Sequence, residues 1–224
     1  MKNSINLSMR IKDELKKSLQ AAWTLRNLIV FFFLAHTVFL AFGQWSVYKG
    51  FPGVLALKEE LIKEIQGLPY LKPLTGVLAD SLALRVLYTF AFNLIFGAFL
   101  TTTLTGALFF LPYVIAVWRA FTIGILVSEM DLNAKTMVVF YGTYILEFGA
   151  YTLSSAVGMD IGLSLMWPGR KSRTSRKDAV SDAILNGKRL YLIVLILLFV
   201  SAVWEISWLQ YLGPLLKPGV INVK

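Results

Sequence analysis

Several ionisable or amide side chains stand in stretches of the chain that otherwise contain almost only apolar, small or hydroxylated residues. They are His36, Asn93, Arg119, Glu147, Asp160 and Glu205. A charged group at the centre of a membrane helix costs about 2.5–3.5 kcal/mol even on lenient insertion scales, so it faces protein or water instead of lipid. The candidate intramembrane polar cluster consists of Asn93, Arg119, Glu147 and Glu205.

The same inventory of residues restricts the chemistry. The chain contains no Cys and one His, which excludes disulfides, thiolate nucleophiles and a multi-histidine metal site within one chain. It also lacks the His-Glu-x-x-His, Gly-x-Ser-x-Gly and phosphate-loop motifs. We therefore predict no catalytic residue, no metal, no cofactor and no enzymatic activity. An intramembrane enzyme that uses Glu147 and Glu205 as an acid pair is the competing hypothesis.

Membrane helices are the elements that must position these side chains. With 57% hydrophobic and 16% charged residues and a mean hydropathy of +0.66, the chain is too apolar for an ordinary soluble domain. Its length suits about four to six spans of about 20 residues each. We predict an all-α, polytopic membrane helix bundle that forms one domain over 1–224. Its five expected spans are 27–47, 81–102, 106–128, 136–165 and 190–212.

The ends of these spans contain residues that interrupt helices. The segment 101–106, which is rich in Thr and ends at Gly106, is the only plausible turn between the second and third spans. Pro112 either kinks the third span or marks its start. The fourth span has candidate breaks at Gly158, Gly162 and Pro168.

Two further segments have amphipathic patterns. Segment 1–26 carries apolar residues at every fourth position from Leu7 to Leu19, which is typical of a helix lying on the cytoplasmic membrane surface. A solvated leader that orients the first span is the alternative. The external loop 48–80 contains a short amphipathic helix on the outer surface. This helix either caps the bundle or docks an external partner.

The basic residues indicate the orientation of the chain. Segments 1–26 and 168–189 together account for the net charge of +9. Lys and Arg concentrate on the cytoplasmic side, and both segments lie there only if an even number of spans separates them. We predict a multi-pass protein of the cell membrane with a cytoplasmic N-terminus and an external C-terminus. Anionic lipid headgroups, and not nucleic acid, are expected at Arg170, Lys171, Arg173, Arg176 and Lys177.

The depths of the polar residues along the predicted spans can be compared. At 1.5 Å per residue, Asn93, Arg119 and Glu147 lie within about 5 Å of one another in depth, and Glu205 lies slightly shallower. We therefore predict an Arg119–Glu147 ion pair with Asn93 as a hydrogen-bonding neighbour. Such a pair either fixes the helix register or lines a polar pocket or gated path. We interpret His36 as a packing residue, with a proton relay as the alternative.

Small residues recur at every fourth position of the stretch 140–167, at Ala150, Ser154, Gly158 and Gly162. We call these four residues the small-residue ridge. Such a ridge lets another helix backbone approach closely where hydrophobicity alone cannot drive association. It predicts a helix-packing face, and we expect self-association into a homo-oligomer through it.

The pattern Glu147-x10-Gly158-Met159-Asp160-Ile161-Gly162 resembles the stage II sporulation protein M family of integral membrane proteins. Asn93 in Phe92-Asn93-Leu94, the stretch from Arg119 to Gly124, and Glu205 ahead of Pro214 are similar to other elements of that family. The resemblance extends over 84–214 and implies a five-span fold without known enzymatic activity. It also implies a role similar to a membrane anchor for cell-wall remodelling machinery.

Two functions from different classes are compatible with these features. The first is a non-enzymatic integral membrane scaffold or assembly protein that self-associates or anchors a membrane or cytoplasmic partner complex. The second is a permease-like subunit that works with a cytoplasmic ATPase. It predicts a water-accessible cavity lined by Asn93, Arg119, Glu147 and Glu205.

Overall fold

A computed structural model of the chain describes residues 2–128, 134–171 and 175–212, and every regular element in these ranges is helical. The α-helices are α1 (Lys2–Thr24), α2 (Arg26–Tyr48), α3 (Pro52–Gly67), α4 (Lys72–Thr75), α5 (Leu82–Phe92), α6 (Leu111–Val127), α7 (Ala134–Met166) and α8 (Arg176–Leu212). The π-helix is η2 (Asn93–Thr103), and the 3₁₀ helices are η1 (Pro69–Leu71), η3 (Leu104–Leu108) and η4 (Pro168–Lys171). The predicted all-α fold is confirmed.

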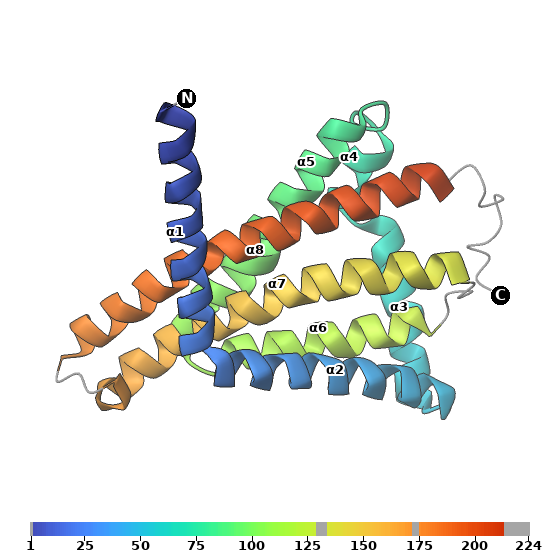
Figure 1. Ribbon diagram of the computed structural model, residues 1–224. Helices are drawn as coiled ribbons and strands as arrows, with labels where there is room; N and C mark the ends of the chain where they lie inside the picture. Colours follow the sequence, from blue (N-terminus) through green and yellow to red (C-terminus); the bar gives the residue numbers. More distant parts are fainter. Residues whose placement is uncertain (1, 129–133, 172–174, 213–224) are drawn as a thin grey trace.

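The long helices form a bundle that has a further helix across each end. α2, α6, α7 and α8 run alongside one another, and α5 is inclined to them (Figure 1). α1 crosses the bundle at a steep angle toward one end, and α3 crosses at the other (Figure 1). The most extensive contacts join α7 to α8 and α2 to α6. The layer between α1 and α3 is therefore the part of the bundle suited to a bilayer.

α1 is held against α8 by a specific contact. The Ser18 hydroxyl donates a hydrogen bond to the carbonyl oxygen of Arg189 at 2.7 Å. Ala21 and Leu25 are buried against Leu190 in the same region. The end of α7 and the start of α8 continue past this crossing (Figure 1). We call the described residues 160–171 and 175–188 the α7–α8 hairpin, and its part with η4 and the start of α8 lies beyond α1 (Figure 1).

Three helices in the described part of the chain are long and apolar enough to cross a membrane: Arg26–Tyr48, Leu82–Leu108 and Arg176–Tyr211. α6 is also apolar but has 17 residues. α7 has 33 residues and runs along most of the bundle (Figure 1). The chain is thus a membrane protein, while the count of five spans stays a prediction.

The turn between the second and third predicted spans lies later than the sequence indicates. The helix continues through the 101–106 segment as η2 and η3, and the chain reverses at Phe109, whose φ is 54°. Thr101 and Thr105 donate hydrogen bonds to carbonyls one turn back, at 2.7 and 2.8 Å, so their hydroxyls reinforce the helix instead of ending it. Pro112 lies in the first turn of α6, where its missing N–H is tolerated, and so marks the start of that helix.

α7 continues without a break through the glycines of the small-residue ridge. It ends at Met166, and Pro168 begins η4, so Pro168 is where the predicted interruption occurs. Gly158 and Gly162 lie where a neighbouring backbone packs against α7. Their lack of a side chain allows this close approach and does not interrupt the helix. An added Cβ would stand 2.2 Å from the Thr102 carbonyl oxygen at Gly158 and 2.4 Å from the Gly106 carbonyl oxygen at Gly162.

A second close crossing joins α2 to α6. An added Cβ on Gly43 would stand 2.3 Å from the Phe121 carbonyl oxygen, and one on Gly124 would stand 2.2 Å from the Leu40 carbonyl oxygen. Backbones that approach this closely gain van der Waals contact, which is the main source of helix association in lipid. The two crossings together fix α6 and η2–η3 against the central helices α2 and α7.

Candidate functional site

The polar cluster is built around Arg119 on α6, which is half-buried. Its guanidinium donates a hydrogen bond to the Thr101 hydroxyl at 2.9 Å and a longer one to the Gly97 carbonyl at 3.4 Å. The guanidinium carbon lies 4.3 Å from the centre of the Tyr151 ring. A desolvated cation–π contact of this kind contributes about 2 kcal/mol. Arg119 therefore ties α6 to both η2 and α7.

Tyr151 carries the contact from Arg119 to Glu147. It is buried, and its hydroxyl donates a hydrogen bond of 2.6 Å to the Glu147 carboxylate one helical turn away. In the part of the chain that the structure describes, no ion pair joins Arg119 to Glu147 directly. The expected pair is thus replaced by a relay through an aromatic ring, because Tyr151 occupies the space between the two charged groups.

Gly97 makes room for this arrangement. A Cβ added at Gly97 would stand 2.6 Å from the Tyr151 hydroxyl oxygen and 2.7 Å from the ring. Any side chain there would push Tyr151 out of its place between Arg119 and Glu147. Gly97 lies within the π-helix η2, and π-helical segments are frequent at functional sites.

The other two predicted members of the cluster differ in their placement. Glu205 on α8 is half-buried and lies close enough to Glu147 and Tyr151 for electrostatic interaction with them. Asn93 is half-buried and begins η2. Among the described residues, no hydrogen bond joins the Asn93 side chain to Arg119 or Glu147. The structure therefore brings together Arg119, Glu147 and Glu205, with Tyr151 at the centre.

A layer of hydroxyl groups lies beside this cluster. The sequence predicts a turn for its threonines and a packing role for Ser154, but not their bonds to one another. Thr102 donates a hydrogen bond to the Ser154 hydroxyl at 2.7 Å. Thr103 bonds to the Tyr191 hydroxyl at 2.7 Å and donates to the Ser154 carbonyl at 3.1 Å. These contacts join η2 to α7 and α8. The run of three threonines inside an apolar span was the signal that could have revealed them.

His36 belongs to the packing of the bundle. Its side chain is 2% exposed, its Nδ1 lies 2.9 Å from the Thr152 hydroxyl, and its ring packs edge-on against Phe148. Within the described ranges, His36 Nε2 has no hydrogen-bond partner. This arrangement favours the packing interpretation.

The small-residue ridge is covered by the chain itself. Ala150, Ser154, Gly158 and Gly162 are all buried. The segment η2–η3 lies on the ridge at backbone distance, and the glycines of the two partners face each other: a Cβ added at Gly106 would stand 2.0 Å from the Gly158 carbonyl oxygen. The packing face is thus as expected, but its partner is within the same chain, so the ridge is not free for self-association.

The basic loop residues lie on the α7–α8 hairpin or outside the described residues. Arg170 forms an ion pair with Asp160, whose side chain is 1% exposed, so this arginine is engaged within the hairpin. Arg176 and Lys177 are exposed at the start of α8. The side chain of Lys171 and all of Arg173 lie outside the described residues. Asp160, expected within the fourth span, is buried in α7, which continues to Met166.

Comparison with known proteins places the chain in a family. No curated protein and no solved structure matches it significantly. The sequence model of a family described as Stage II sporulation protein M matches residues 27–208, which include every member of the polar cluster and of the small-residue ridge. The chain therefore belongs to the stage II sporulation protein M family.

Proposed function

We propose that the chain is a non-enzymatic membrane scaffold that anchors a partner complex in the cell membrane. The observation that carries this proposal is the backbone-distance packing at Gly106–Gly158 and Gly43–Gly124. Packing this close leaves no room for a continuous path between α7 and η2–η3 or between α2 and α6 at those crossings. It makes the bundle a fixed platform, with α1 and the α7–α8 hairpin toward one end and α3 at the other.

The orientation that we propose has α1 in the cytoplasm and α3 outside. Ile11, Leu19 and Trp23 are exposed on α1, while Lys12, Lys16 and Lys17 are exposed on the same helix, which suits a helix lying at a lipid surface. The natural absence of Cys allows a clean test with Lys12→Cys and Lys63→Cys, both at exposed positions. A membrane-impermeant thiol reagent should label position 63 on intact cells and position 12 only after permeabilisation. Labelling of position 12 on intact cells would refute this orientation.

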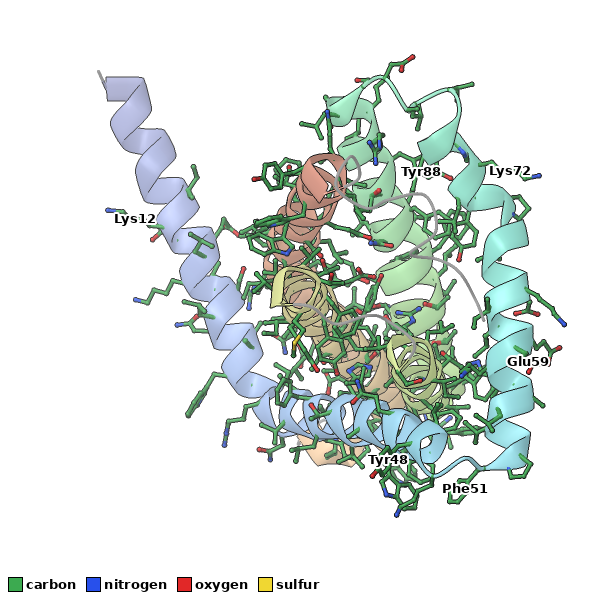
Figure 2. The ribbon with its side chains drawn as sticks, turned by 90° about the vertical axis from the view of Figure 1, so that its right-hand side faces the viewer. Lys12, Tyr48, Phe51, Glu59, Lys72 and Tyr88 are labelled. Carbon is green, nitrogen blue, oxygen red and sulfur yellow. The ribbon has the colours of Figure 1, made fainter. Side chains whose placement is uncertain are left out.

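α3 is the surface that we assign to an external partner. Glu59, Glu60 and Lys63 are exposed along it, and Glu59 points away from the bundle (Figure 2). A photo-crosslinking residue at position 59 should capture a partner from native membranes, and one at Ile145, which is 68% exposed on α7, is the matched control. A wall hydrolase captured at position 59 alone would support an anchor. Equal capture at both positions, or none at 59, would contradict this surface.

Self-association needs a face other than the small-residue ridge, and we propose the aromatic face of α2 and α6. Phe42 stacks on Phe121, and a groove of about 330 Å³ runs beside them. Trp118 lines this groove and is 54% exposed. Trp118→Cys should form an intermolecular disulfide in oxidised membranes, whereas the exposed control Ile145→Cys should not. Crosslinking at 145 instead of 118 would exclude this face.

A permease-like subunit is the second candidate, and the cluster of Arg119, Glu147 and Glu205 is the observation that favours it. A water-accessible cavity there would expose Glu147→Cys and Glu205→Cys to water-soluble thiol reagents. We expect both positions to remain unreactive in the folded protein, with Lys63→Cys as the reactive control. Rapid labelling at 147 and 205 would reject the closed scaffold in favour of the permease.

A further inference from the structure

A hollow of about 530 Å³ lies between η2–η3, α7 and α8, toward the end of the bundle that α1 crosses. Phe99, Leu104, Ala107, Ile161 and Ile184 are among the apolar residues of its wall. Its volume is within the range of small-molecule sites in proteins, about 300–1,000 Å³. The hollow is therefore large enough to hold a ligand and apolar enough to select one with a hydrocarbon part.

The hydroxyl groups in this wall already have partners. Thr103 and Tyr191 bond to each other through their hydroxyls at 2.7 Å. Thr103 also donates to the Ser154 carbonyl, and Tyr191 lies within hydrogen-bond distance of the Ala98 carbonyl at 3.2 Å. An occupant therefore meets no unpaired hydroxyl group there, and an apolar chain can fill the hollow without leaving these groups unsatisfied.

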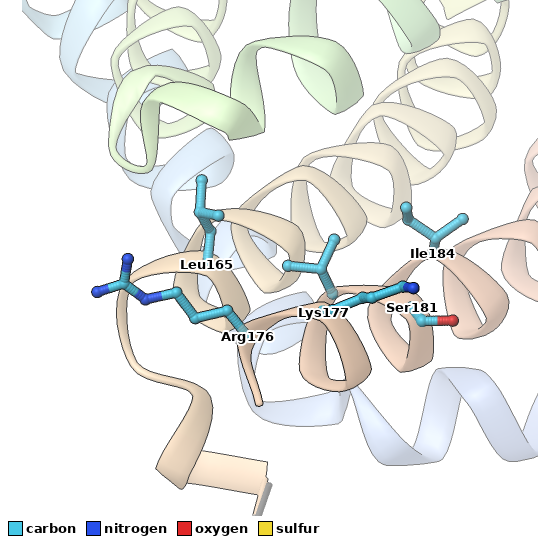
Figure 3. A pocket seen from close by; sticks show the side chains of 6 residues that line it. Leu165, Arg176, Lys177, Ser181 and Ile184 are labelled. Carbon is cyan, nitrogen blue, oxygen red and sulfur yellow. The ribbon is translucent and has the colours of Figure 1, made fainter. Parts of the chain in front are cut away.

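A second hollow of about 410 Å³ continues along the hairpin and shares Ile184 with the first. Leu165 and Ile184 point to the same side of the hairpin, the Lys177 side chain extends toward Ile184, and the Arg176 side chain extends the opposite way (Figure 3). Lys188 lines the first hollow. The two hollows together form what we call the α8 groove, and its charged lining residues are all basic.

The charged residues that line the α8 groove occur in two places along α8. Arg176 and Lys177 lie at its start, and Lys188 lies beside the hydroxyl-lined part near Tyr191. The acidic residues of this part of α8, Asp178 and Asp182, are absent from the lining of both hollows.

We propose that the α8 groove binds a phospholipid with an anionic headgroup, whose phosphate lies between Lys188 and Lys177 and whose acyl chain lies along Phe99, Leu104 and Ile161. This site goes beyond the proposed scaffold role, because it concerns a specific lipid and not a protein partner. It also differs from general attraction of the basic loop to a charged surface, because the apolar half of the groove holds one chain of the lipid.

Native mass spectrometry of the full-length protein in a mild detergent tests the charged half. Phosphatidylglycerol is titrated against phosphatidylcholine as the zwitterionic probe. We expect one retained phosphatidylglycerol per chain, and Lys188→Gln should weaken it about fivefold, with further loss when Lys177 is also replaced by Gln. Lys63→Gln on α3 is the matched control and should retain the lipid. Equal retention of both lipids, or no effect of Lys188→Gln, would overturn the proposal.

Ala107→Phe tests the apolar half, because a ring at this exposed position fills the hollow without changing a charge. It should lower the retention of phosphatidylglycerol about tenfold, whereas Ile145→Phe at a comparably exposed position should not change it. Unchanged helical circular dichroism shows that each variant is folded. Inorganic phosphate at about 10 mM should fail to displace the lipid. Complete displacement by phosphate, or wild-type retention in Ala107→Phe, would refute a lipid site.

Discussion

Replacement of Gly158 by Ala is the sharpest test of the close packing between α7 and η2–η3. The new Cβ would stand 2.2 Å from the Thr102 carbonyl oxygen and 3.1 Å from the Thr103 carbonyl oxygen. Both are backbone atoms, so no side-chain rotation can relieve the clash. α7 and η2–η3 must separate instead. We therefore expect Gly158→Ala to destabilise the protein although Ala is the better helix former.

The size of this effect can be worked out from the contacts that the separation breaks. Overpacking of a close contact costs about 1–3 kcal/mol. The bonds that Ser154 makes with Thr102 and Thr103, of 2.7 and 3.1 Å, lie one turn from the clash and are lost or lengthened. Each contributes about 1 kcal/mol. The higher helix propensity of Ala returns about 1 kcal/mol. The expected net destabilisation is about 2–4 kcal/mol.

Gly149 supplies the matched control, because it lies in the same helix and an added Cβ there makes an ordinary 3.7 Å contact with Leu197. Gly149→Ala should leave the stability unchanged or raise it by up to about 1 kcal/mol. Reversible unfolding in mixed micelles, followed by circular dichroism, measures both variants. If Gly158→Ala proves as stable as Gly149→Ala, the backbones are not in the close contact on which the scaffold proposal depends.

Three further predictions concern the side-chain contacts, with the same unfolding measurement as the readout. Tyr151→Phe removes the hydroxyl that donates to Glu147 and should cost about 1.5–3 kcal/mol, and an unchanged stability would contradict the relay. Arg119→Lys keeps the charge but loses the planar contact with Tyr151, so it should cost about 1–2 kcal/mol. A double-mutant cycle of Asp160→Asn and Arg170→Gln should give a coupling energy of about 1–3 kcal/mol, and an additive cycle would show that the ion pair is not energetically significant.

The sequence carried most of the information on which faces of the helices are buried. The four-residue spacing of the small-residue ridge predicted a close packing face, and all of its members are buried. Spacing along one helix says nothing about which backbone comes to lie on that face. The partner could be a second copy or another part of the same chain, and only the position of η2–η3 decides this. The expectation of self-association through the ridge therefore depended on information that a single helix does not contain.

The polar cluster was predictable in its depth but not in its connections. The residue count along each span brought Arg119 and Glu147 to one level, and they do lie near each other. A direct ion pair also requires the two side chains to point at each other without an intervening group. Tyr151 stands one turn from Glu147 and fills that space because Gly97 leaves room for its ring. The four-residue spacing places Tyr151 on the same helix face as Glu147, but a single helix does not show that its ring stands between Glu147 and Arg119.

The π-helix η2 bears on the choice between a fixed register and a gated path. Three sets of contacts hold it: Arg119 bonds to Thr101, Ser154 to Thr102, and Tyr191 to Thr103. A gate requires an element with two discrete arrangements that a ligand can bias. Opening at η2 would break these bonds together, at about 1 kcal/mol or more each, and would also separate the Gly106–Gly158 contact. The polar residues around η2 therefore act against its movement, which favours the scaffold over the permease.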